Sequence, residues 1–137
     1  MILLLSPKDK DQMPNQVQNP NSKYDLKVRT SLFGEKIILL MKTVPDSTIN
    51  RPLISQLIRS GTSIGANYME ADGAQSKKDF SHKIAISKKE AKESMHWLHM
   101  LAVANNNLKT PLRELWKEAH ELVLILSSIY IKSTAKK

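Results

Sequence analysis

The sequence contains no cysteine, only four glycines and two phenylalanines, and no long hydrophobic run. Without cysteine the chain can form neither disulfide bonds nor thiolate metal sites, and it has no cysteine nucleophile, which suits a reducing cytoplasm. No segment approaches the roughly 18 apolar residues of a membrane-spanning helix. The opening MILLLS has a short apolar run and no basic residues before it, so it makes a poor secretory signal. We therefore expect a cytoplasmic protein.

The residues that are abundant favour helices and an anionic partner. Hydrophobic residues make up 41% of the chain, whereas aromatic residues, which favour sheets, make up 5%. A length of 137 residues fits one domain. The formal net charge of +8 favours binding to phosphates, because clustered lysine and arginine gain free energy when they release condensed counterions.

Residues 1–22 differ in composition from the rest of the chain. They include SPKDKDQMPNQVQNPNS, which has no hydrophobic period, so we expect a flexible tail. Residues 23–137 carry four segments with apolar residues spaced as on one face of a helix, separated by short turn signals. Short connections make successive helices antiparallel. The sequence thus predicts an all-α, antiparallel up-down-up-down four-helix bundle.

Capping residues, prolines and a glycine mark the expected helix ends. We expect the first helix over about 24–43 and the second over about 51–73, with the third starting after 76 and the fourth after 110. The marker residues are Ser22 as the cap of the first helix with Asp25 three residues on, Pro45 after that helix, Gly73 after the second, Ser76 and Asp79 at the third, and Thr110 and Pro111 at the fourth.

The second segment contains RSGTSIGANYMEADG, which begins with two glycines, two serines and a threonine in seven residues. A phosphate-binding loop needs G-x-x-x-x-G-K-[ST] after a strand, and a dinucleotide-binding turn needs G-x-G-x-x-G; neither spacing occurs. Gly61 and Gly65 instead stand four residues apart on the helix face that carries Leu57 and Tyr68. Each costs about 1 kcal/mol of helix propensity, so we interpret them as positions where a neighbouring backbone comes close.

Four polar residues of the same segment share another helix face. Arg59, Ser63, Asn67 and Glu70 follow a 4-4-3 spacing. We interpret them, together with the two glycines, as a structural or oligomer seam, in which Arg59 and Glu70 flank hydrogen-bonding Ser63 and Asn67 along a neighbouring helix or subunit. The alternative is a ligand site.

The third segment carries a basic stripe opposite its apolar face. Its members recur at three- and four-residue steps over roughly 30 Å of helix. They are Lys78, His82, Lys89, Lys92, His96 and His99. One interpretation is a solvated face whose lysines pair with Glu90 and Glu93. The other is a nucleic-acid-binding surface that strengthens as the histidines protonate.

Metal binding and catalysis find little support in the sequence. Glu93-x-x-His96 resembles one ligand motif of di-iron bundles, but those bundles use two copies plus further inward glutamates, and this single copy points away from the apolar stripe. His120 is interpreted as a helix-surface residue. No Ser-His-Asp set or carboxylate pair can be argued from spacing. We expect no metal, no cofactor and no catalytic residue.

The fourth segment ends in LVLILSSIYI, residues 122–131, which is apolar around nearly the whole helix. A helix that is apolar all round is buried on more than one side, which the surface of a four-helix monomer does not provide. We therefore expect self-association. The alternative is that this run is simply a well-buried core helix.

The stretch QLIRSGTSIGANYMEADGAQSKKDFSHKIAISKKEAKESMHWLHML resembles the small bacterial four-helix-bundle family encoded within intervening sequences of 23S rRNA genes. The likeness spans about residues 24–135. Its most specific parts are Tyr24-Asp25-Leu26, the Arg59-Ser60-x-Thr62-Ser63-Ile64-x-x-Asn67-x-x-Glu70 helix, Ser76-Lys77-Lys78-Asp79-Phe80, and Glu90-Ala91-x-Glu93 with Trp97-Leu98.

The resemblance implies a non-enzymatic bundle that assembles into a homo-oligomeric ring, commonly a pentamer. The family is also similar in fold to the accessory protein of diversity-generating retroelements, a basic pentamer that binds nucleic acid and a reverse transcriptase. That relative is distant, so a reverse transcriptase as partner is an analogy. For the intervening-sequence proteins themselves the resemblance implies no settled biochemical role.

Three functions are therefore compared. The first is a homo-oligomeric basic protein that binds RNA, DNA or a nucleoprotein partner through the third helix. The second is a protein-binding adaptor whose apolar surfaces assemble the oligomer and hold a helix of another protein. The third, an enzyme, would need a convergent polar pocket.

Overall fold

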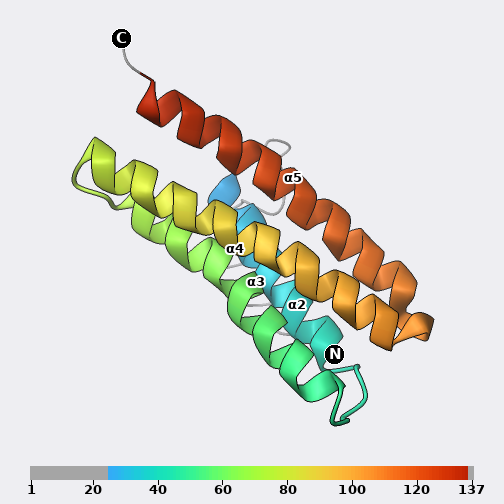
Figure 1. Ribbon diagram of the computed structural model, residues 1–137. Helices are drawn as coiled ribbons and strands as arrows, with labels where there is room; N and C mark the ends of the chain where they lie inside the picture. Colours follow the sequence, from blue (N-terminus) through green and yellow to red (C-terminus); the bar gives the residue numbers. More distant parts are fainter. Residues whose placement is uncertain (1–24, 136–137) are drawn as a thin grey trace, which may run out of the picture.

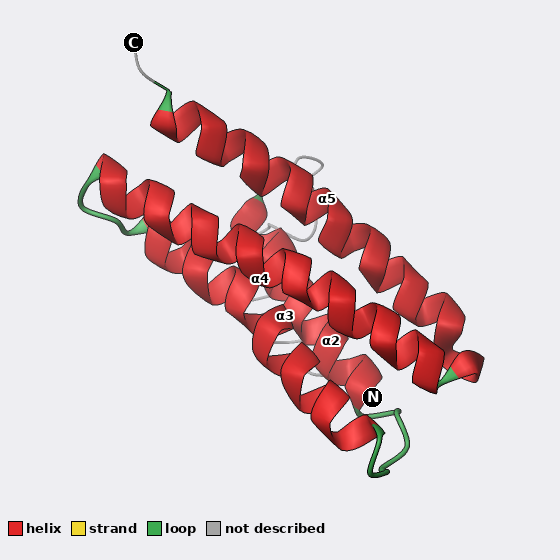
Figure 2. Cartoon of the chain, viewed as in Figure 1, coloured by secondary structure: helices red, strands yellow, loops and turns green. Residues whose placement is uncertain are grey.

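The computed structural model describes residues 25–135, which form four long helices (Figure 1). In chain order these are α2 (Leu26–Met41), α3 (Asn50–Asp72), α4 (Lys77–Ala104) and α5 (Lys109–Thr134), with the 3-10 turn η2 (Asn106–Leu108) before α5. No strand occurs within residues 25–135 (Figure 2). The all-α up-down-up-down bundle predicted from the sequence is confirmed. The expected tail, residues 1–22, lies outside the described residues.

The start of α2 differs from the expectation because Asp25 caps it. The Asp25 carboxylate accepts hydrogen bonds from the backbone N–H groups of Lys27 and Val28, at 3.0 and 3.5 Å. These are donors that the first turn of a helix cannot pair internally. The helix therefore begins at Leu26 rather than at residue 24. Ser22, the expected cap, lies outside the part that the structure describes.

The caps expected for the later helices are confirmed at two places and wrong at a third. Gly73 is the C-cap of α3, and the Ser76 hydroxyl accepts from the backbone N–H of Asp79 at 3.0 Å, so both expectations are confirmed. The expected cap at Thr110 is wrong. Helix α5 already begins at Lys109, and its N-cap position is Leu108, which makes no side-chain cap bond. The 3-10 turn feeds the chain directly into α5.

The apolar stripes of the helices meet in one core. Each helix contributes side chains that are at most 1% exposed. In the middle of α4 the fully buried side chains are small, namely Ser87, Ala91 and Ser94. The largest of the core residues are Phe33 and Ile37 of α2, Leu57 and Ile64 of α3, Ile84, Leu98 and Leu101 of α4, and Leu112, Leu122 and Leu126 of α5.

Helix α4 lies between α3 and α5 and packs extensively against both, while α2 packs mainly on α3 (Figure 1). The contact between α2 and α5 is much smaller. The bundle is therefore less closed along the α2–α5 edge than along the other three. Among the described helices none is long and apolar enough to cross a membrane.

The glycines of α3 lie where α2 approaches. A Cβ atom at Gly61 would stand 3.1 Å from a side-chain carbon of Ile37, and one at Gly65 would stand 3.3 Å from the hydroxyl of Thr30. The first distance is shorter than ordinary packing between carbon atoms, which is about 3.5–4.0 Å. The two glycines therefore leave room on α3 for α2 of the same chain to pack closely.

Candidate functional site

The outer face of α4 carries the basic stripe predicted from the sequence. All six side chains are exposed, and α4 turns its opposite side to the core. These residues, Lys78, His82, Lys89, Lys92, His96 and His99, are called the α4 basic face below. At a rise of 1.5 Å per residue, the face extends over roughly 30 Å.

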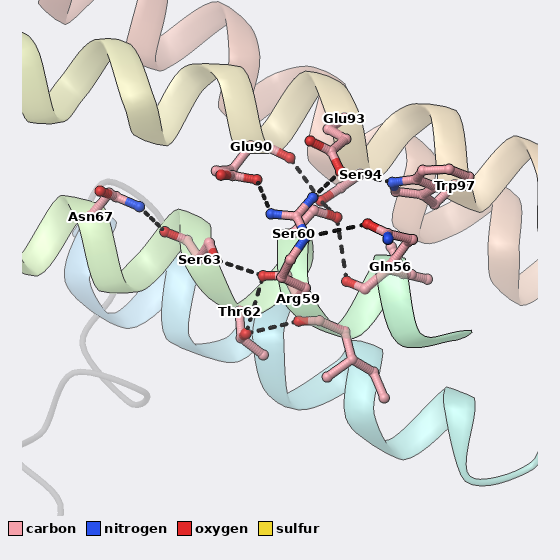
Figure 3. Close-up of polar contacts among 12 residues, drawn as sticks. Gln56, Arg59, Ser60, Thr62, Ser63, Asn67, Glu90, Glu93, Ser94 and Trp97 are labelled. Atoms are coloured by element: carbon pink, nitrogen blue, oxygen red, sulfur yellow. Dashed lines mark hydrogen bonds and ion pairs between the residues drawn. The ribbon is translucent and has the colours of Figure 1, made fainter. Parts of the chain in front are cut away.

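Glu90 and Glu93 of α4 do not neutralise this face, because they point to α3. Figure 3 shows Arg59 of α3 reaching across to Glu90 and Glu93. The Arg59 guanidinium donates to Glu90 over 3.1 Å and also to Glu93. Glu93 further accepts from the indole nitrogen of Trp97 at 2.9 Å. The expectation that Glu90 and Glu93 pair with neighbouring lysines is therefore wrong.

The consequence is a row of unneutralised charge. Within the described residues, Lys78, Lys89 and Lys92 form no ion pair with any carboxylate. Lys89 and Lys92 stand three residues apart on this face, and like charges that neighbour each other on a helix weakly destabilise it. An anionic partner would relieve that repulsion.

The residues of the expected polar seam split into two kinds. Arg59 and Glu70 both reach α4, Arg59 as described and Glu70 through an ion pair with Lys83 at 2.6 Å. Ser63 and Asn67 instead bond to the backbone of their own helix. The Ser63 hydroxyl donates to the Arg59 carbonyl at 2.6 Å, and the Asn67 amide donates to the Ser63 carbonyl at 2.9 Å (Figure 3).

Arg59 and Glu70, the two end residues of the seam, thus join α3 to α4 within one chain. The contacts of Arg59 with Glu90 and Glu93 are called the Arg59 clamp below. Glu90 is buried, with 8% of its surface exposed, and a buried carboxylate is costly unless it is paired. Arg59 supplies that pairing. The seam residues Gly61 and Gly65 face α2 instead, so the six residues do not form one surface.

The histidines of α4 lie apart from any cluster of acidic ligands. His96 packs its ring edge-on against Trp97, with the centroids 4.7 Å apart. Across residues 25–135, no group of three or more His, Asp or Glu side chains converges as a metal site would require.

A groove between α4 and α5 brings His99 of the α4 basic face together with residues of α5 for which the sequence indicated no role. It has a volume of about 420 Å³ and lies where α4 passes through η2 into α5. Its basic and aromatic lining residues are His99, Lys109, Arg113, Trp116 and Lys117. Three of them, Lys109, Arg113 and Lys117, stand around Trp116 on α5, a pattern of basic residues interleaved with an aromatic that could have indicated a binding surface on this helix.

The apolar run of α5 is buried on one side and bare on the other. Leu122 and Leu126 lie in the core, whereas Leu124 is 56% and Ile131 66% exposed. The alternative of a simply well-buried core helix is thus not what this chain shows. The outer side of α5 around Leu124 and Ile131 is called the α5 apolar face below.

Comparison with known proteins identifies the family. A family model described as 23S rRNA-intervening sequence protein matches residues 23–128, well over half of the chain. The chain belongs to this family. The resemblance expected from the sequence is therefore confirmed. The matched region includes the whole α4 basic face and the Arg59 clamp.

A solved structure supports the fold of the family member. The chain is similar to the crystal structure of a protein with unknown function from the S23 ribosomal protein family of Bacteroides thetaiotaomicron. The two share 33% sequence identity with a TM-score of 0.66, over 76% of this chain and 96% of that chain. None of the curated proteins matches the sequence.

Proposed function

We propose that this protein is a non-enzymatic homo-oligomer that binds nucleic acid, RNA or DNA, or a nucleoprotein partner, through the α4 basic face. The observation that carries the proposal is the separation of charge on α4. Glu90 and Glu93 of this helix are bound to Arg59 on the α3 side. The three lysines of the α4 basic face, Lys78, Lys89 and Lys92, have no carboxylate partner among the described residues. Such a face displaces counterions from a phosphate backbone.

The homo-oligomer is supported by the α5 apolar face. Exposed Leu124 and Ile131 lie in a ten-residue stretch that carries no charge, and apolar surface of this kind commonly marks a protein contact. A ring of copies, with a pentamer as the form implied by the family resemblance, would bury this face. It would also multiply the basic faces available to one nucleic acid, which raises avidity.

The test is a salt titration of binding with a matched control pair. Binding of fluorescein-labelled RNA and duplex DNA is measured by anisotropy for the wild type, for Lys89→Gln/Lys92→Gln, and for Lys36→Gln/Lys42→Gln. Both double variants remove two positive charges from exposed lysines. The second pair, however, lies on α2, where Lys42 is the C-cap residue. The first pair should weaken binding and lower the slope of log affinity against log salt by about 2. The control pair should leave the slope unchanged.

Two results would refute the nucleic-acid proposal. One is the absence of binding at about 50 mM salt, where phosphate contacts are strong. The other is an equal loss in both double variants, because that would indicate a response to net charge rather than to the α4 basic face.

The second candidate is a protein-binding adaptor without direct nucleic-acid contact. It is favoured by the same exposed Leu124 and Ile131, since an amphipathic helix of another protein could cover them. This candidate requires a partner that stays bound after nuclease treatment and is lost from Leu124→Gln/Ile131→Gln. A partner released by nuclease would favour the first candidate.

A further inference from the structure

The two tryptophans of the chain have opposite environments. Trp97 on α4 donates its indole N–H to Glu93 and so belongs to the Arg59 clamp. Trp116 on α5 lines the α4–α5 groove and is 37% exposed, and within the described part of the chain its indole nitrogen has no hydrogen-bond partner. A large aromatic ring left at the surface costs free energy unless something covers it. Trp116 is therefore available to a ligand.

The groove next to Trp116 is apolar at its base and basic at its rim. Leu98, Ala102 and Leu112 line it together with the cationic side chains of Lys109 and Arg113. Lys117 also lines it and is 3.8 Å from Glu114, a loose and exposed ion pair. The volume of about 420 Å³ lies in the range of about 300–1,000 Å³ in which proteins hold small ligands.

His120 helps to hold the Trp116 ring in place. The two rings stack with centroids 5.4 Å apart and planes 25° apart, and His120 is not among the residues that line the groove. A ring fixed by a neighbour loses less freedom when it binds a ligand.

The groove at Trp116 meets the α4 basic face, and a second, separate hollow at the other end of the α4–α5 seam has similar chemistry. His99 belongs both to that face and to the groove at Trp116. A second hollow of about 440 Å³ lies between the start of α4 and the end of α5, lined by Lys77, Lys78, His82 and Tyr130. Trp116 and Tyr130 are fourteen residues apart on one helix, or about 21 Å. An aromatic ring with cations beside it thus occurs at both ends of the α4–α5 seam.

We infer that the α4–α5 seam is a binding track for single-stranded nucleic acid, in which one base stacks on Trp116. This inference rests on the proposed function and names its substrate class. Arg113, Lys109 and His99 hold the phosphates beside the stacked base, and Tyr130 offers a second stacking position near Lys78. Aromatic rings within a cationic groove are the means by which proteins hold single strands without reading their sequence, whereas the bases of a duplex are already stacked on each other and unavailable.

A second copy of the chain is a poorer occupant of this groove. Exposed tryptophan is also common at protein interfaces. However, no acidic residue lines the groove. A second copy that covered it would therefore bury the cationic Lys109 and Arg113, together with His99, without a partner from the groove, and buried unpaired charge is costly.

The experiment uses Trp116 as its own reporter. In a Trp97→Phe background the emission comes from Trp116 alone, because the chain has two tryptophans. The ligands are an oligothymidylate, an abasic strand of the same length, a duplex of the same length, and thymidine monophosphate. Affinities are measured at about 50 mM salt for this background and for the added changes Trp116→Ala, Trp116→Phe and Tyr130→Ala.

The oligothymidylate should quench Trp116 emission, and the abasic strand should not. Trp116→Ala should weaken oligothymidylate binding by about 5- to 150-fold, since stacking of one base contributes about 1–3 kcal/mol. Trp116→Phe should keep most of the affinity, and Tyr130→Ala should lose less than Trp116→Ala. Binding of the duplex and of the abasic strand should not change in any of these variants.

Other outcomes overturn the inference in distinguishable ways. If Trp116→Ala binds the oligothymidylate like its parent, the stacking site is wrong while the basic face stands. If thymidine monophosphate binds as tightly as the strand, the site serves free nucleotides. If Trp116→Ala lowers the oligomer mass measured by light scattering, Trp116 is a subunit contact. If no ligand binds at all, the proposed function fails together with the inference.

Discussion

Arg29 of α2 and Glu118 of α5 form a bidentate ion pair. It spans the contact between α2 and α5, which is the least extensive contact between long helices in the bundle. The guanidinium donates from Nε to one carboxylate oxygen at 2.7 Å and from Nη2 to the other at 2.8 Å. Glu121 adds a third contact at 2.8 Å. The hydrogen bond that Arg29 donates to Glu118 is the main cause that raises the pKa of Arg29 above its usual value. This pair joins α2 to α5 where apolar packing is sparse.

Glu118→Gln should lower the free energy of unfolding by about 1–2 kcal/mol. Both partners are mostly buried, with side chains 17% and 27% exposed, so a charge-assisted bond is lost in a poorly hydrated place. The control is Glu114→Gln, which removes an exposed carboxylate of the same helix whose one ion pair within residues 25–135, to Lys117, is long. It should change stability by less than about 0.5 kcal/mol. Urea unfolding measures both, and equal losses would contradict a special role for Arg29–Glu118.

Gly61→Ala and Gly34→Ala should differ although both add one methyl group to a buried helical glycine. A Cβ at Gly34 meets α3 atoms no closer than 3.6 Å, which is ordinary contact, so that variant should gain up to about 1 kcal/mol from helix propensity. At Gly61 the new atom would press on Ile37 at 3.1 Å. Overpacking costs about 1–3 kcal/mol, so Gly61→Ala should be the less stable variant by about that amount.

Thermal and urea unfolding of the two variants provide the measurement. If Gly61→Ala proved as stable as Gly34→Ala, then Ile37 would have moved aside without cost, and the close approach of α2 and α3 would not explain the glycine.

The fold could be predicted from the sequence because each helix is long and strongly patterned. Stripes such as Phe33 with Ile37, or Leu122 with Leu126, repeat often enough that one displaced residue does not change the pattern. Helix ends depend on single local contacts. At the first helix Asp25 captured the free N–H groups, and before α5 a 3-10 turn replaced the cap expected at Thr110.

The site was predictable only in part because partners come from other helices. The spacing along α4 placed the basic residues on one side correctly. It could not show that Glu93 binds Arg59, thirty-four residues away, because that contact depends on how α3 and α4 are aligned. The groove at Trp116 was not predicted for the same reason, since His99 comes from α4 and Arg113 from α5. Sequence periodicity assigns a residue to a face of its helix, and packing decides what that face meets.

Tyr68→Phe should make the protein more resistant to alkaline pH. Burial is the main cause that raises the pKa of Tyr68 above 10.0, with Asp72 and Asp25 adding to the shift and Lys27 opposing it. A raised pKa means that the fold favours the neutral phenol. This stability is complete below the ordinary tyrosine pKa and is lost as the pH rises from there through the raised value.

The measurement is the thermal midpoint of wild type and Tyr68→Phe between about pH 8 and 11. The difference between them should shift in favour of the phenylalanine variant as the pH passes about 10, because phenylalanine cannot ionise. Parallel curves for the two proteins would show that Tyr68 does not contribute to alkaline unfolding.

Leu124→Gln/Ile131→Gln should shift the protein from an oligomer to the 15.5 kDa monomer in light scattering. The two side chains are the most exposed large apolar residues of an uncharged stretch, so glutamine removes apolar area that a subunit contact would bury while keeping good helix propensity. Val103→Gln is the control, because Val103 is a still more exposed aliphatic residue, at 72%, on another helix. That variant should keep the mass of the wild type. A wild type that is already monomeric would contradict self-association, and an unchanged mass in the double variant would place the contact on a surface other than the α5 apolar face.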